Sequence, residues 1–306
     1  MGEPLTSGFA ESRRGQPPVV QPFDQIDRLE RAEALDRPAA AIRPVVQRLL
    51  RDRRVKDALH GVWLGHPLHP ALVHLTLGSL LSASLIDLVG GKRRYSTGLI
   101  ATGLLLTPPT AAAGWADWSA AHPDQQRVGL VHASTNALAV SCYAAALWKR
   151  ARGRRGGRLL SLAGAAVASV GAALGGHLSY HLALGANHAD RVSDLAPQGW
   201  QPLGALSEVP EGTPVRRTAG EVPVVVLRRG EKVNVLADRC PHLAGPLSGG
   251  EVVGTDGNAR VVCPWHGSEF RLDDGHVVHG PATAPVPRFE TRVVSGKLEV
   301  RITPPG

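Results

Sequence analysis

Two short motifs near the end of the chain combine the side chains that bind transition metals. Cys240 and His242 stand two residues apart, and Cys263 and His266 stand three apart after an interval of twenty residues. Two thiolates and two imidazoles could hold a tetrahedral zinc ion. The same four groups could hold a [2Fe–2S] cluster, with both cysteines on one iron and both histidines on the other. The ligand set alone leaves both interpretations open.

The local sequences around the motifs resemble the Rieske family over about residues 197–303. Gly245-Pro246-Leu247 follows the first pair, and Ser268-Glu269-Phe270 follows the second. The resemblance implies a [2Fe–2S] cluster at the tips of two β loops, with the imidazole edges toward solvent. The ligands it implies are Cys240 and Cys263 for the buried iron, and His242 and His266 for the outer iron.

Departures from the family's high-potential branch predict a lower reduction potential. That branch joins its two loops by an extra disulfide, whereas this chain has Gly245 (or Ala244) and Trp265 at those positions. Ser268 is in place to donate a hydrogen bond to a cluster sulfur, but the family's tyrosine is Phe270 here. Fewer hydrogen bonds to the sulfurs lower the potential. We therefore expect a ferredoxin-like centre and not one of the cytochrome bc type.

The number of residues after the second motif argues against an oxygenase catalytic domain in this chain. A Rieske oxygenase has a large catalytic domain after the cluster, and only 40 residues follow His266. We therefore expect an oxidoreductase or electron-transfer component, not an oxygenase catalytic subunit.

The residues around the motifs predict an all-β domain, at 197–303. Short strand-like runs pair across turns, at 222–229 with 232–238, 270–272 with 276–278, and 289–294 with 297–302. The metal motifs would lie in loops of this domain.

Four apolar runs precede the β domain, at residues 71–89, 97–118, 128–148 and 159–184. Each is close to the ~20 residues that a helix needs to cross a bilayer. Six of the eight net positive charges lie within residues 67–196, in basic loops between the runs. This pattern predicts a four-helix transmembrane bundle at 61–190 and argues against a nucleic-acid binder.

The N-terminal segment, 1–60, is predicted to be a disordered or amphipathic tail. Residues 1–30 are polar and scattered in charge, and they show no secretory signal. From Gln25 to His60 the apolar residues fall at helical spacing, and Pro38 and Pro44 should divide the run into two short helices. These helices could lie on the membrane surface or form a solvated linker.

The membrane region resembles an uncharacterised bacterial family of four-helix membrane proteins, some of which are fused to Rieske domains. The resemblance covers about residues 60–187 and rests on Gly61–Pro70, Gly114–Trp118 and Gly175–Tyr180. It implies the bundle but no activity.

Histidines within the apolar runs gather toward one membrane surface, where the Rieske domain also leaves the bundle. They are His74, His132, His177 and His181, with Asp117 and His122 at the same depth. Histidines in a membrane are costly without partners and are often functional. Two from facing helices could ligate a b-type haem, with His74 or His132 as the partner of His177 or His181. They could also bind another metal or a quinone, or form interhelical hydrogen bonds.

These inferences predict a membrane-anchored Rieske protein that passes single electrons between a membrane donor, quinol or haem, and an acceptor. The alternatives are a self-contained quinol oxidoreductase and a non-catalytic redox sensor or ferredoxin dock. The basic loops at 92–94 and 149–158 hold nine Lys and Arg against six on the Rieske side, which favours a Rieske domain outside the cell. The long N-terminal segment without a signal and the missing disulfide favour the cytoplasmic face, which we expect.

Overall fold

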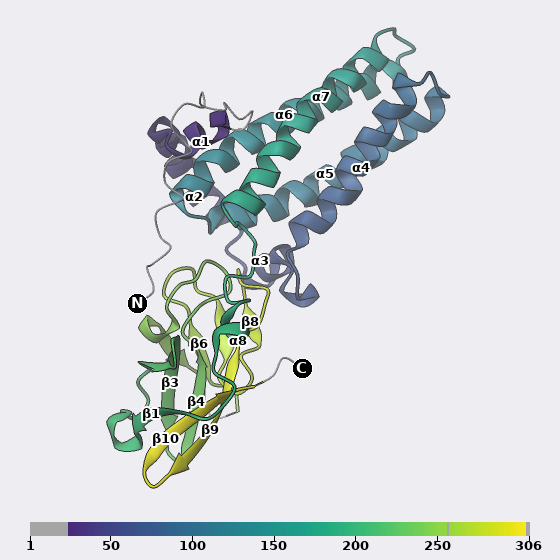
Figure 1. Ribbon diagram of the computed structural model, residues 1–306. Helices are drawn as coiled ribbons and strands as arrows, with labels where there is room; N and C mark the ends of the chain where they lie inside the picture. The colour runs from purple at the N-terminus through teal and green to yellow at the C-terminus, as the bar shows by residue number, and fades with distance from the viewer. Residues whose placement is uncertain (1–23, 256, 304–306) are drawn as a thin grey trace, which may run out of the picture.

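The computed structural model describes residues 24–255 and 257–303 (Figure 1). An elongated helical part is followed by an all-β part that lies at one end of it. This arrangement confirms the predicted fold class of a four-helix bundle followed by a β domain.

Four long helices make up the bundle, and each is long and apolar enough to cross a membrane. They are α4 (Leu68–Leu88), α5 (Arg93–Ser119), α6 (Pro123–Ala151) and α7 (Gly157–Gly176). One π-helical turn, η3 (His177–His181), continues α7. The closest packing is between α4 and α5 and between α6 and α7.

Small residues let α6 and α7 approach closely. A Cβ atom on Gly171 would lie 2.4 Å from Oδ1 of Asn136, and one on Gly175 would lie 3.0 Å from the ring of His132. Helices in lipid associate through such small-residue contacts, because lipid supplies no hydrophobic drive between them. The polar groups of α6 are therefore packed directly against the backbone of α7.

The N-terminal segment is helical and packed, which corrects the expectation of a tail between residues 24 and 60. It forms α1 (Asp24–Glu30), η1 (Glu33–Leu35), α2 (Asp36–Leu49), α3 (Arg53–His60) and then η2 (Val62–Leu64). Ala39 and Val46 of α2 are buried against Trp118 and Leu130 of the bundle. The apolar face of this segment is therefore buried against the bundle. Residues 1–23, also predicted to belong to the tail, lie outside the described part of the chain.

The two prolines do not divide α2, contrary to the prediction. Pro38 lies in the first turn, where the missing N–H would have no helical partner, and the helix continues through Pro44. The break comes after Leu49 instead. There Asp52 caps α3 by accepting hydrogen bonds from the backbone N–H groups of Arg54 and Val55.

The β domain consists of two antiparallel sheets. The first has the order β1-β10-β9-β4-β3-β2 and the second β5-β6-β7-β8. The strands are β1 (Gln201–Ala205), β2 (Val215–Ala219), β3 (Val222–Arg229), β4 (Lys232–Ala237), β5 (Glu251–Val253), β6 (Arg260–Val262), β7 (Glu269–Arg271), β8 (Val277–His279), β9 (Arg288–Val294) and β10 (Lys297–Ile302). The short helix α8 (Val192–Leu195) precedes them. All three predicted hairpins form, as β3–β4, β7–β8 and β9–β10.

Candidate metal centre

The two motifs lie in loops that tight backbone hydrogen bonds hold at one end of the β domain. One loop follows β4 and the other joins β6 to β7. The Cys240 N–H donates to the carbonyl of Gly245 at 2.9 Å, and the Cys263 N–H donates to the carbonyl of Ser268 at 2.8 Å. Each loop is therefore closed on itself, with its cysteine at the start of the turn.

All four predicted ligand side chains come together between these loops. The imidazole rings of His242 and His266 lie 4.9 Å apart at 84°. The thiols of Cys240 and Cys263 are buried and within hydrogen-bond reach of each other. A Cβ atom at position 245 would lie 3.0 Å from Sγ of Cys263, so the glycine is required for this approach.

The side chains present fit a [2Fe–2S] cluster. Nδ1 of His242 is buried and has no hydrogen-bond partner among the described residues, which leaves its lone pair for a metal. Burial lowers the pKa of His242 to about 2 and that of His266 to about 4, so both rings are neutral at physiological pH. The hydrogen bond from Cys240 lowers the pKa of the Cys263 thiol. Two thiols and two neutral imidazoles are the Rieske donor set.

Ser268 lies beneath the second loop with its hydroxyl hydrogen unused. The side chain is fully buried, and its Oγ accepts the backbone N–H of Ala282 at 3.0 Å. The expected donation from this O–H to a cluster sulfur stays a prediction, and the contact of Oγ with the Ala282 N–H leaves its hydrogen available for it. Phe270, at the family's tyrosine position, is also wholly buried and contributes only apolar surface.

Both proposed histidine ligands lie next to the membrane bundle, which corrects the expectation of a solvent-facing edge for His242, whereas His266 is half-buried and lines a cavity. His242 is only 9% exposed. The ring of His122, from the loop between α5 and α6, lies 5.7 Å from the ring of His266. His60 and His188 are close enough to His242 to disfavour its protonation. The bundle end therefore covers the part of the centre that a free Rieske domain would expose.

Polar contacts from α3 fasten the β domain in this position. Asp57 lies 2.6 Å from Nδ1 of His279 through one carboxylate oxygen and accepts the Gly280 N–H at 3.0 Å through the other. Arg53 forms an ion pair with the buried Glu269. No pattern in the sequence marked these residues, because their partners are more than 200 positions away.

A second set of contacts holds the first ligand loop. The His188 N–H donates to the carbonyl of Pro241 at 2.9 Å, and Arg239 donates to the carbonyl of His188 at 2.6 Å. On the bundle side, Nδ1 of the buried His60 lies 2.7 Å from Oδ1 of Asp117. Asp117, predicted to lie at this surface, thus orients a histidine next to the centre.

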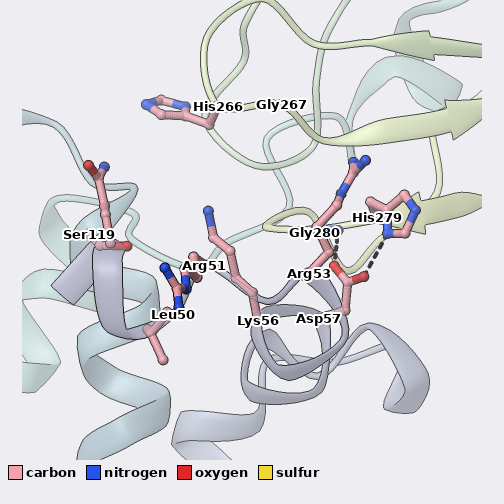
Figure 2. A pocket seen from close by; sticks show the side chains of 11 residues that line it. Leu50, Arg51, Arg53, Lys56, Asp57, Ser119, His266, Gly267, His279 and Gly280 are labelled. Carbon is pink, nitrogen blue, oxygen red and sulfur yellow. Dashed lines mark hydrogen bonds and ion pairs between the residues drawn. The ribbon is translucent and has the colours of Figure 1, made fainter. Parts of the chain in front are cut away.

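A cavity of about 320 Å³ remains between the bundle and the β domain (Figure 2). His266 and Gly267 line it from the cluster loop, and α3 supplies Lys56. The other lining residues are Gln47, Leu50, Arg51, Arg53, Asp57, Ser119, His279 and Gly280. Lys56 points toward His266, and burial lowers the pKa of its amine. The cavity therefore brings cationic side chains to the exposed side of a predicted iron ligand.

The four membrane histidines do not meet in one place. Nδ1 of His74 lies 2.6 Å from the carbonyl of Pro70 on its own helix. His132 lies 2.9 Å from the carbonyl of Gly171 across the α6–α7 contact. The rings of His177 and His181 stack, with centroids 4.5 Å apart. The structure thus places His177 and His181 in contact with each other, whereas His74 and His132 each contact a backbone carbonyl elsewhere in the bundle.

Comparisons with known proteins divide the chain at the same point. Residues 199–290 match the family described as Rieske [2Fe-2S] domain, and residues 65–188 match the family described as predicted membrane protein (DUF2231). The chain is 37% identical over 103 residues to the anthranilate 1,2-dioxygenase ferredoxin subunit of Burkholderia cepacia, covering 34% of this chain and 92% of that protein. It is 33% identical over 105 residues to ferredoxin CarAc of Metapseudomonas resinovorans, covering 34% and 94%. It is also 29% identical over 101 residues to the cytochrome b6-f complex iron-sulfur subunit of Chlorobaculum tepidum, covering 33% and 52%.

Proposed function

This chain belongs to the Rieske [2Fe–2S] family, and from that membership we propose that it carries single electrons between a membrane quinol and a redox partner. Its Rieske relatives are named as ferredoxins and as an iron–sulfur subunit of a cytochrome complex. When bound, a [2Fe–2S] cluster supplies one-electron transfer. The four ligands we propose for it are Cys240, His242, Cys263 and His266.

The proposal of a membrane donor rests on the position of the two proposed histidine ligands next to the bundle. His242 and His266 are turned toward the bundle end, and the cavity that reaches His266 lies between the bundle and the β domain. A donor dissolved in the membrane reaches this place at the bilayer surface. A large soluble partner would have to displace α3 from Glu269 and His279 to reach the same ring.

The cavity residues have defined roles in this proposal. Arg51 and Lys56 both line this cavity, where their cationic groups would meet a ligand, and the neighbouring Asp57 favours the charged form of Lys56. A cation beside a quinol hydroxyl lowers the cost of losing its proton. The ring of His266 is neutral because burial disfavours its protonation, so a ring nitrogen not bound to iron would accept a hydrogen bond from the quinol hydroxyl.

We also propose that the Rieske domain lies on the cytoplasmic side. Gly245 and Trp265 stand where a disulfide between the two cluster loops would need cysteines, and loops without such a disulfide suit a reducing compartment. Protease digestion of right-side-out and inside-out vesicles checks this, since a tag after the Rieske domain should be cleaved only in the inside-out preparation.

The quinol proposal is tested by stopped-flow reduction of the full chain in detergent with a short-chain quinol. Replacing Lys56 or Arg51 with Gln should slow reduction by quinol about tenfold, because a cation near a partly buried site contributes on the order of 1.4 kcal/mol. Reduction by dithionite should stay unchanged, which shows that the cluster is intact. Lys297→Gln, in β10 far from the cavity, is the matched control.

The same experiment separates the alternatives. Equal slowing by Lys297→Gln, or no slowing by Lys56→Gln and Arg51→Gln together, would refute the cavity as the donor site. Steady turnover of quinol with an added electron acceptor would identify a self-contained quinol oxidoreductase. A redox sensor would show cluster reduction without turnover with any acceptor.

A further inference from the structure

We propose that the N-terminal helix α1 and the last membrane helix together bind a divalent transition metal ion, with Zn²⁺ the best match. Four side chains converge there: Asp27 and Glu30 from α1, and His177 and His181 from η3. Their potential ligand atoms all lie within 4.8 Å of one another. None of these residues belongs to the iron–sulfur centre, so this site is independent of the function proposed above.

The π-helical turn presents both histidines to the same point. The rings of His177 and His181 are nearly parallel, at 21°, with centroids 4.5 Å apart. Nε2 of His177 lies 2.7 Å from Oε1 of Glu30, and Nε2 of His181 lies 3.7 Å from the same oxygen. A π turn at the end of a long helix is uncommon and frequently marks a functional position.

The two carboxylates of α1 are held in place by contacts that do not involve the histidines. Asp27 and Glu30 are three residues apart and therefore share one face of α1. Ile26 and Leu29 pack against a cluster of buried apolar residues of α6, α7 and η3. Arg127 of α6 donates to the backbone carbonyl of Glu30 at 2.6 Å. The helix is thus held in place with its acidic face toward η3.

The donor set suits a structural zinc ion. Zinc takes four ligands from imidazole nitrogens and carboxylate oxygens at about 2.0–2.2 Å, most often in tetrahedral geometry. Two carboxylates balance the charge of the ion, and two neutral imidazoles complete its coordination. The side chain of His177 is 7% exposed and that of Glu30 is 20% exposed, whereas that of His181 is 60% exposed. The ion would enter from the side of His181 and tie α1 to the end of the bundle.

The test is metal binding to the full chain in detergent, after dialysis against a mild chelator. Isothermal titration with Zn²⁺ should show one ion per chain. Glu30→Gln and His177→Ala should each weaken binding at least tenfold. The matched controls are Glu33→Gln in η1 and His74→Ala in α4, which remove the same groups outside the cluster and should leave the affinity unchanged.

A second readout keeps the result interpretable if a variant is unstable. Each variant should retain its iron content and its iron–sulfur EPR signal, which shows that the chain is folded. Added Zn²⁺ should slow hydrogen exchange in α1 of the wild-type chain and not in His177→Ala. Failure of the folded wild-type chain to bind Zn²⁺ stoichiometrically, or an equal loss of affinity in the control variants, would overturn the proposal and leave the four residues as an ion-pair cluster.

Discussion

The ring of His122 lies 5.7 Å from the ring of His266, at an interplanar angle of 69°. His122 precedes the first turn of α6, where its backbone N–H donates to the side chain of Gln125 at 2.9 Å. His266 belongs to a loop of the β domain more than 140 positions later. This contact joins the membrane bundle directly to a proposed iron ligand. The surroundings of that ligand therefore depend on how the β domain sits against the bundle.

Loss of a proposed ligand should remove the iron–sulfur cluster. We expect His242→Ala and Cys263→Ser to lose the visible absorption and the EPR signal of the reduced cluster, because a Rieske centre needs both ligand types. Iron analysis of the purified chain measures the loss. His276→Ala, an exposed histidine in the same domain, should retain two iron atoms per chain. A full cluster in His242→Ala would contradict the assignment.

Ser268→Ala should lower the reduction potential. One hydrogen bond to a charged group contributes roughly 1.5 kcal/mol, which corresponds to about 60 mV for a one-electron couple. Redox titration followed by EPR measures the shift. The change also leaves the N–H of Ala282 without its acceptor, so some loss of stability should accompany it. Ser207→Ala, at an exposed position, should change neither quantity.

Asp57→Ala should loosen the β domain from the bundle. It removes the contacts to Nδ1 of His279 and to the N–H of Gly280, which together contribute about 1–3 kcal/mol. We expect faster proteolysis within residues 183–200, the connection between the two parts. Asp190→Ala, an exposed aspartate within that connection, is the control. Unchanged proteolysis in Asp57→Ala would show that these contacts do not hold the domain.

Acid should release α2 from the bundle. Hydrogen bonds from Arg127 to both carboxylate oxygens, at 2.6 and 2.8 Å, lower the pKa of Asp36 below its usual 3.8. A depressed pKa in the folded state stabilises the contact above the unfolded pKa, and this stabilisation is lost as the pH falls through the folded value.

Hydrogen exchange of α2 measures this release. Asp36→Asn at neutral pH should exchange faster than the wild-type chain, and the difference should disappear as the pH falls through the lowered pKa of Asp36 in the folded chain. Glu33→Gln, one turn away, lacks this pair of hydrogen bonds and should behave as the wild-type chain does.

Local patterns in the chain predict the two classes of structure and the four candidate ligands. Four charge-poor runs of about bilayer length, bounded by basic loops, favour membrane helices over the buried helices of a soluble protein, and a chain in lipid must satisfy its backbone hydrogen bonds within helices. The Cys-x-His and Cys-x-x-His motifs are local in the chain. Their spacing therefore predicts the four proposed ligands without knowledge of long-range packing.

The contacts between these parts depend on long-range packing, which local patterns do not show. Asp57 and His279 are 222 positions apart, and Asp27 and His177 are 150 apart, and neither pair leaves a periodic pattern in the sequence. The sequence predicts amphipathic N-terminal helices because apolar side chains recur at helical spacing. This spacing shows which face of each helix is apolar, but not which surface of the protein covers that face. The low helix propensity of proline predicts that the helix ends at Pro44, but propensity describes an isolated helix. Here the packing of Val46 against the bundle stabilises the helix beyond Pro44.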